Sequence, residues 1–195
     1  MGSATDDIAQ AAARLVVDDG LEYGAAKRKA ARDLSRRNGR RTELPSNEAI
    51  EDEVRDYLSL FQADTQPGEL MALRQLALQW MERLQAFRPH LAGAVWRGTA
   101  TRRSAVQIEL YCDDPKAAEI ALLDQRIDFD PVGQPDGPDV LRVDARCAEL
   151  GEHIAIFLHV LDRDDLRGGL KPDARGRTWR GDLPALQRLL HADAP

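Results

Sequence analysis

The segment GTATRRSAVQIEL (residues 98–110) joins a polar turn containing glycine to a stretch in which apolar and polar residues alternate. Side chains of a β-strand point alternately to its two faces. The apolar residues at positions 106, 108 and 110 therefore share one face, and Gln107, Glu109 and Tyr111 share the other. This pattern predicts a strand that packs on a core and carries its polar residues outward, next to the turn.

The residues before this segment predict helices. Apolar residues recur at helical spacing through residues 1–64, where Gly20, Asn38-Gly39 and Pro45-Ser46 separate three predicted helices. A broad apolar face predicts a longer helix at residues 69–87, which Pro89 ends.

After Pro89 the apolar period changes to that of strands. Strands are predicted at 91–98, 105–112, 127–131, 139–144 and 153–161, and helices at 114–126 and 183–192. Mixed elements of this kind predict an α+β fold. We expect a helical N-terminal arm at residues 1–64 and an α+β domain at 65–195, with a mixed sheet packed on helices.

The composition excludes several classes of protein. With 195 residues and 43% hydrophobic content, the chain can bury one ordinary core with an appendage. No apolar stretch approaches the ~20 residues of a membrane span, and a signal-peptide pattern is missing. Cys112 and Cys147 lack CxxC spacing, and no phosphate-loop or serine-hydrolase motif occurs. We expect a cytoplasmic protein with no membrane partner.

The strand and its turn resemble the signature of the nucleotidyltransferase superfamily, which includes DNA polymerase beta and the minimal bacterial nucleotidyltransferases. In that family a strand leads to a Gly-Ser turn that opens a short helix, and the next strand carries two carboxylates one residue apart. Gly98 and Thr99 stand at the Gly-Ser position, and SAVQIEL (104–110) stands where the family commonly has a run similar to Ser-Asp-Ile-Asp-Leu. The resemblance covers about residues 67–162 and implies a nucleotidyltransferase-like sheet.

The resemblance also implies a site for a nucleoside triphosphate. Glycine lets the backbone approach phosphate, and hydroxyl and N–H groups at a helix start bind anionic oxygens. The implied nucleotide-binding residues are Gly98, Thr99, Arg102, Arg103 and Ser104. The two arginines would neutralise phosphate charge.

The implied metal site departs from the family pattern. Paired carboxylates hold the Mg²⁺ ions that in-line displacement requires, and a later strand supplies a third. Here Glu109, the expected catalytic residue, keeps its charge, whereas Gln107 and His159 stand at the other two positions. An amide oxygen brings no charge to Mg²⁺, so weak or lost transfer activity is expected. The alternative is that Gly98 serves only a tight turn and Glu109 is a solvated strand residue.

A second candidate region is the basic, glycine-containing segment at residues 162–182. It could fold over a triphosphate or an RNA backbone, with Trp179 available for stacking. Its candidate binding residues are Arg167, Lys171, Arg175, Arg177 and Arg180. The alternative is a solvated loop, because five aspartates in the same segment could pair with the cations.

The net charge of −6 conceals a basic cluster between Lys27 and Arg41, which holds eight Lys/Arg and one Asp. Clustered cations bind RNA by releasing counterions from phosphate, so RNA is a candidate partner of the arm. The alternative is a solvated helix face with an internal partner in the acidic residues 47–56.

The whole chain also resembles a group of short uncharacterised bacterial proteins, chiefly proteobacterial. The resemblance rests on sequence segments such as KRKAARDL and DRDDLRGGLKPDARGR. Some of that group carry the label UDP-N-acetylmuramate–alanine ligase, which the missing phosphate loop does not support. Two hypotheses follow. The first is a nucleotidyltransferase-like protein that binds NTP with Mg²⁺, or nucleic acid, with weak or lost transfer. The second is a non-catalytic interaction module whose basic arm binds RNA or a protein.

Overall fold

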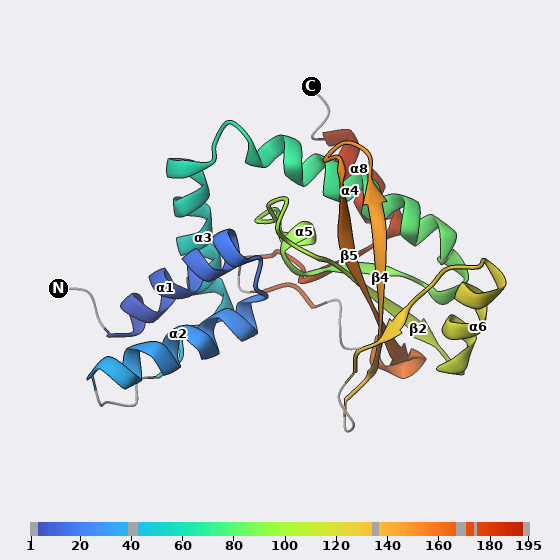
Figure 1. Ribbon diagram of the computed structural model, residues 1–195, viewed down its shortest axis with the longest axis horizontal. Helices are drawn as coiled ribbons and strands as arrows, with labels where there is room; N and C mark the ends of the chain where they lie inside the picture. The colour runs from blue at the N-terminus through green and yellow to red at the C-terminus, as the bar shows by residue number, and fades with distance from the viewer. Residues whose placement is uncertain (1–3, 39–42, 134–136, 167–170, 174, 193–195) are drawn as a thin grey trace. The chain divides into compact units, whose positions relative to one another are not determined.

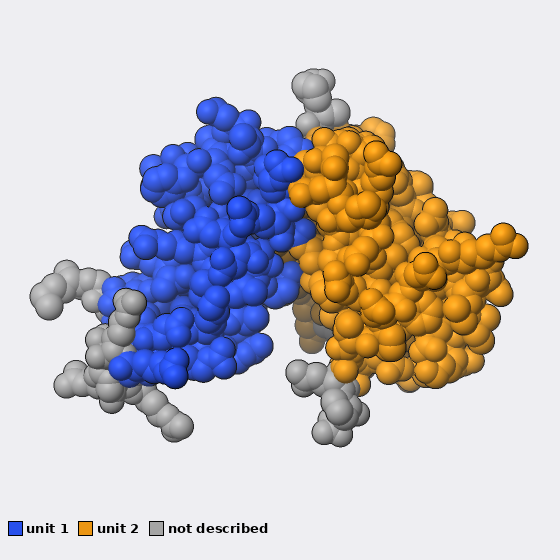
Figure 2. Space-filling model, in the orientation of Figure 1, with its two compact units in different colours: residues 1–70, 99–104 blue, residues 71–98, 105–195 orange. Residues whose placement is uncertain are grey.

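The computed structural model describes residues 4–38, 43–133, 137–166, 171–173 and 175–192. The chain divides into two compact units (Figure 2): residues 1–70 with 99–104 form the first, and residues 71–98 with 105–195 form the second. Helices and one mixed sheet together make an α+β fold, as predicted. Within the described part, no helix has the length and apolar character to span a membrane.

The first unit contains three helices that pack on one another: α1 (Ala4–Asp19), α2 (Tyr23–Asn38) and α3 (Asn47–Phe61). Their buried faces consist largely of alanine and β-branched residues, such as Ala12, which is inaccessible to solvent. The Ser46 hydroxyl accepts the N–H of Ala49 and caps the start of α3. All three helices of the arm are confirmed.

The sheet lies in the second unit, where β2, β4 and β5 run through its centre (Figure 1). Its strand order is β3-β4-β5-β2-β1-β6, in which β2 and β5 are parallel and the other pairs that the structure resolves are antiparallel. The strands are β1 (His90–Ala92), β2 (Val106–Cys112), β3 (Asp130–Pro131), β4 (Asp139–Cys147), β5 (Glu152–Asp162) and β6 (Arg180–Asp182).

One face of the sheet is apolar and buried. Val106, Ile108 and Leu110 on β2 are inaccessible to solvent, as their alternation predicted. Three helices of this unit contact its strands: α5 (Gly93–Arg97), α6 (Lys116–Asp124) and α8 (Leu183–Ala192). A fourth helix, α4 (Gln66–Arg83), begins in the first unit and ends in the second. The opposite face of the sheet carries the polar side chains considered below.

Two predicted features were wrong. Residues 91–98 do not form one strand, because β1 ends at Ala92 and the helix α5 follows. Short apolar runs fit a buried helix as well as a strand, and Ala94 and Val95 are indeed buried on α5. The basic segment also contains β6, an edge strand that pairs with β1 and that its sequence did not indicate.

Candidate functional site

The polar face of the sheet is assembled by strand register. Glu109 on β2 pairs with His159 on the parallel strand β5 and with His90 on β1. Gln107 pairs with Phe157 on β5. Directly paired residues point to the same face, so the structure brings Gln107, Glu109 and His159 together.

Glu109 is held by two neighbours on this face. The Arg180 guanidinium from β6 lies 2.5 Å from its Oε2, and the Tyr111 hydroxyl donates to the same oxygen at 2.6 Å. The Glu109 side chain is only 15% exposed and that of Arg180 only 23%. Burial, and then the hydrogen bond to Glu109, raise the pKa of Tyr111 to about 12, so the phenol keeps its proton. Glu109 is therefore a neutralised, hydrogen-bonded carboxylate.

Gln107 and His159 satisfy each other. The Nε2 of His159 lies 2.7 Å from Oε1 of Gln107. Because an amide oxygen only accepts hydrogen bonds, Nε2 carries the proton and donates. Burial lowers the pKa of His159, which favours the neutral imidazole.

These groups do not fit the Mg²⁺ site that the resemblance implies. Glu109 is neutralised by Arg180, the amide oxygen of Gln107 is occupied, and Nε2 of His159 has no free lone pair. Mg²⁺ takes hard oxygen ligands, which this set supplies from a single carboxylate already in use. Across the described residues, no three His, Cys, Asp or Glu side chains are grouped so that they could hold a metal ion.

The later aspartates do not complete the set. Asp162 caps the short 3-10 helix η2 (Arg163–Asp165), since its Oδ1 accepts the N–H of Asp164 at 2.8 Å. Arg163 pairs with Asp113 at 3.1 Å on the exposed surface. Asp162 and Arg163 therefore have structural roles in the turn after β5.

Gly98 and Thr99 end a helix, whereas the predicted phosphate turn should open one. Gly98 adopts a left-handed conformation, φ 80°, and its N–H donates to the carbonyl of Ala94 at the end of α5. The residue that follows β1 and opens α5 is instead Gly93, with φ 68°. The next residue, Ala94, carries no hydroxyl.

The hydroxyl groups of the predicted turn are used inside the first unit. Thr99 is 1% exposed, and its Oγ1 lies 2.5 Å from the hydroxyl of Tyr23 on α2. Ser104, also buried, accepts the N–H of Thr101 at 3.0 Å. Residues 99–104 thus dock onto the helical arm, and neither Thr99 nor Ser104 offers its hydroxyl to a ligand in this arrangement.

Arg102 and Arg103 are the exposed residues of this loop. Arg102 donates its backbone N–H to Glu69 at 2.9 Å, and Arg103 donates from Nη1 to the carbonyl of Asp18 at 2.9 Å. Both line a polar pocket of about 520 Å³ in the first unit. The predicted site residues are therefore divided: Thr99–Ser104 belong to the first unit, whereas Gln107, Glu109 and His159 belong to the second.

The basic segment is organised by one aspartate. Asp173, with a side chain 1% exposed, pairs with Arg97 at 3.0 Å and accepts the backbone N–H groups of Arg175 and Arg177. Those backbone hydrogen bonds, that of Arg177 foremost, lower the pKa of Asp173. Trp179 lies under the Arg97 guanidinium, 4.1 Å from ring centroid to Cζ, so this ring is already stacked.

The remaining candidates of this segment differ in position. Lys171 and Arg175 are exposed, Arg180 lies in the ion pair with Glu109, and Arg167 lies outside the described residues. In the basic cluster of the arm, residues 39–41 also lie outside the described residues.

Alternation in the sequence places Tyr111 on the same face of β2 as Glu109, but it does not show that the two side chains are hydrogen-bonded. Arg180 stands 71 residues from Glu109, and no local pattern relates them.

The sequence was compared with models of known protein families and with curated proteins, and neither comparison gave a match.

Proposed function

We propose that the second unit is a nucleotidyltransferase-like domain that binds a nucleoside triphosphate through Arg180, with nucleotidyl transfer weak or lost. The observation that carries this proposal is the ion pair between Arg180 and Glu109 on the polar sheet face. Glu109 stands where the resemblance implies a metal-binding carboxylate. Its partner Arg180 offers a cation to phosphate.

The chemistry of arginine supports a phosphate ligand. A guanidinium binds carboxylate and phosphate through the same planar fork of donors. Glu109 occupies the Nη1 side of Arg180, while Nε of Arg180 is buried and makes no hydrogen bond within the described structure. A phosphate would compete with Glu109 for this guanidinium. The carboxylate therefore opposes binding in this proposal, whereas in a metal site it would promote binding.

Two further groups on the same face suit a nucleotide. His159 is a neutral hydrogen-bonding group paired with Gln107, and Phe157 is half-buried beside Gln107 in the strand register. An aromatic ring of this kind can stack with a base.

The test is a thermal-unfolding series with ATP, GTP, CTP and UTP, each with and without Mg²⁺, since a specific ligand raises apparent stability by mass action. Wild type, Glu109→Gln and Arg180→Gln are compared. We expect a shift that does not require Mg²⁺, increases in Glu109→Gln and disappears in Arg180→Gln. A Mg²⁺-dependent shift that Glu109→Gln abolishes would instead support a working metal site.

A matched control tests whether removing the carboxylate partner of any arginine increases the nucleotide-induced shift in thermal unfolding. Arg142 pairs with Asp144 on β4 at 2.9 Å, and this pair is exposed. Asp144→Asn removes the same charge as Glu109→Gln and should leave the nucleotide shift unchanged. An equal gain in both variants, or no shift with any nucleotide, would contradict a site at Arg180.

A further inference from the structure

The five cations of helix α2 whose side chains the structure describes fall into two groups. Lys27 donates from Nζ to Asn47 at 2.9 Å, and Lys29 pairs with Asp19 at 3.1 Å. These two lysines tie α2 to its neighbours within the first unit. The three others are Arg28, Arg32 and Arg36, and all three are exposed.

The three arginines form a single row, the arginine stripe. They are spaced four residues apart, which places them on one helix face at intervals of about 6 Å. The buried face of α2 contains Tyr23 and Ala26. Arg32, about two and a half turns after Tyr23, points to the opposite side of the helix.

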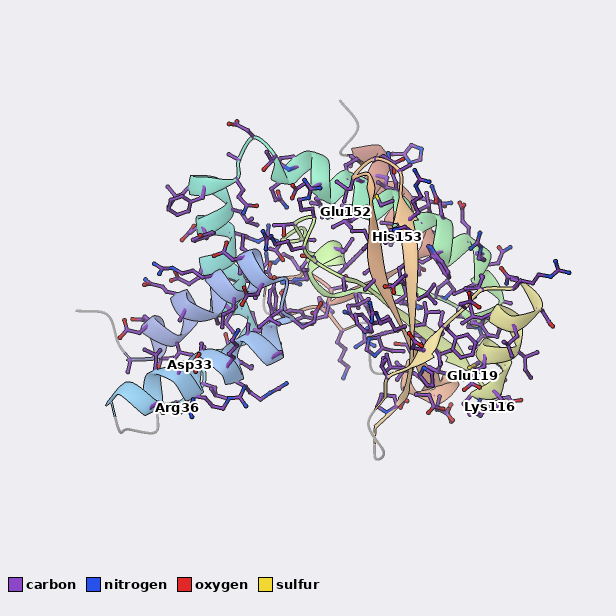
Figure 3. All side chains as sticks on the ribbon, viewed as in Figure 1. Asp33, Arg36, Lys116, Glu119, Glu152 and His153 are labelled. Carbon is purple, nitrogen blue, oxygen red and sulfur yellow. The ribbon has the colours of Figure 1, made fainter. Side chains whose placement is uncertain are left out.

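No ion pair holds the stripe to the rest of the described structure. No acidic side chain of the described residues pairs with Arg28, Arg32 or Arg36. Of residues 47–56, the alternative internal partner of the basic cluster, Asn47 accepts from Lys27, and Glu51 pairs with Arg55 on the same helix at 2.8 Å. Figure 3 shows the nearest acidic residue on α2, Asp33, close to Arg36 on the same helix, and Asp33 too is exposed.

Such a row is unfavourable for the helix alone. Like charges four residues apart destabilise a helix. A polyanion along the row would relieve this repulsion and release its own counterions. The chain is otherwise acidic, with a net charge of −6, so the stripe is a local exception.

We propose that the arginine stripe of α2 binds the phosphodiester backbone of a nucleic acid. Guanidinium groups match phosphate oxygens, and a regular row of them matches a chain with a repeating charge. A membrane surface fits less well, because a helix that lies in a membrane exposes an apolar face. The apolar face of α2 is buried, and the stripe is flanked by small residues, Gly24, Ala25 and Ser35. This inference is independent of the nucleotide site at Arg180.

The test measures fluorescence anisotropy of labelled oligonucleotides, single- and double-stranded, as RNA and as DNA, over a range of salt. The full chain is compared with the triple variant Arg28→Gln/Arg32→Gln/Arg36→Gln. We expect wild type to bind at low salt, and the variant to bind at least about tenfold more weakly. The slope of log affinity against log salt should fall by about two to three, for three lost phosphate contacts. The four oligonucleotides show which backbone geometry the stripe prefers.

A control with the same change of charge is Arg83→Gln/Arg126→Gln/Arg188→Gln, whose three arginines are exposed in the second unit. It should retain wild-type affinity and slope, and Asp33→Asn should bind more tightly than wild type. Circular dichroism checks that α2 stays helical in every variant. The proposal is overturned if wild type does not bind, if both triple variants lose equal affinity, or if polyglutamate competes as well as RNA of equal charge. Glu109→Gln should not change this binding, which separates it from the nucleotide site.

Discussion

The hydroxyl groups of Tyr23 and Thr99 lie 2.5 Å apart and are both buried, although 76 positions separate the two residues in the sequence. Thr101 adds a second link, since its hydroxyl donates to the carbonyl of Val17 at 3.4 Å. The loop at residues 99–104 is thus a structural part of the helical arm. This use of the loop explains why its hydroxyl groups are not directed toward solvent.

Removing the Tyr23 hydroxyl should destabilise the arm. Tyr23→Phe leaves the buried Thr99 hydroxyl without its partner, which costs about 1–3 kcal/mol of unfolding free energy. The matched control is Tyr57→Phe, because the Tyr57 hydroxyl makes only a 3.5 Å contact with Asp18 at the surface. Chemical denaturation of both variants checks the difference. Equal losses would mean that the Tyr23–Thr99 contact contributes little.

Gly20 provides an independent test of the same docking. Its φ is +67°, and a Cβ there would lie 2.0 Å from the carbonyl oxygen of Arg103. Gly151 has nearly the same φ, +69°, with no atom within 4 Å of its Cβ position. Gly151→Ala should therefore cost only the backbone strain, about 1 kcal/mol, whereas Gly20→Ala should cost at least about 2 kcal/mol more. Comparable midpoints in urea for the two variants would show that the loop is not packed against Gly20.

His159 should give the second unit a pH-dependent stability. Burial lowers its pKa below the ordinary value of 6.5, so the unfolded chain binds a proton more readily than the folded chain. The stabilisation is complete above pH 6.5 and is lost as the pH falls toward the lowered value. His159→Asn cannot titrate there, so its unfolding free energy should change less than that of wild type between pH 7.5 and pH 5. Urea denaturation of both proteins at the two pH values measures this difference.

The matched control for His159 is His153→Asn, which alters an exposed histidine on the same strand (Figure 3). It should retain the wild-type pH dependence. A loss of the dependence in His153→Asn, with none in His159→Asn, would show that His159 is not responsible for the pH dependence.

Asp173 should be more important for stability than an exposed aspartate. Asp173→Asn removes the partner of the buried Arg97 and weakens the acceptor for two backbone N–H groups. We expect its melting temperature to fall clearly further than that of Asp144→Asn, whose ion pair with Arg142 is exposed. Because the pKa of Asp173 is lowered, its contribution should disappear as the pH falls through that lowered value. Melting curves at several acidic pH values compare the two variants, and similar curves would contradict this role.

Local sequence signals were sufficient for most of the secondary structure. The separators Gly20 and Pro45-Ser46 marked helix ends because one permits a left-handed turn and the other caps α3. Alternation identified β2 and β5, since each buries one face and leaves most of the other face partly exposed. The same logic failed at β1 and α5, where the apolar run was too short to have a clear period.

The candidate site was only partly predictable. Alternation placed Gln107 and Glu109 on one face, and the family resemblance implied His159 beside them; paired strands align these side chains in the structure. Neither signal showed that Arg180 would neutralise Glu109, or that Tyr23 would occupy the hydroxyl of Thr99.

The sequence by itself determined the α+β class, the helical arm and the polar face of β2, because these depend on the periodicity of neighbouring residues. Tertiary structure alone decided which charges are paired. Arg180 reaches Glu109 only because β6 joins the sheet beside β1. Lys27 and Lys29 find partners, whereas no acidic side chain in the described part of the chain pairs with the arginine stripe. Ion pairs between distant residues are selected by the packing of whole elements, and that packing leaves no periodic pattern in the chain.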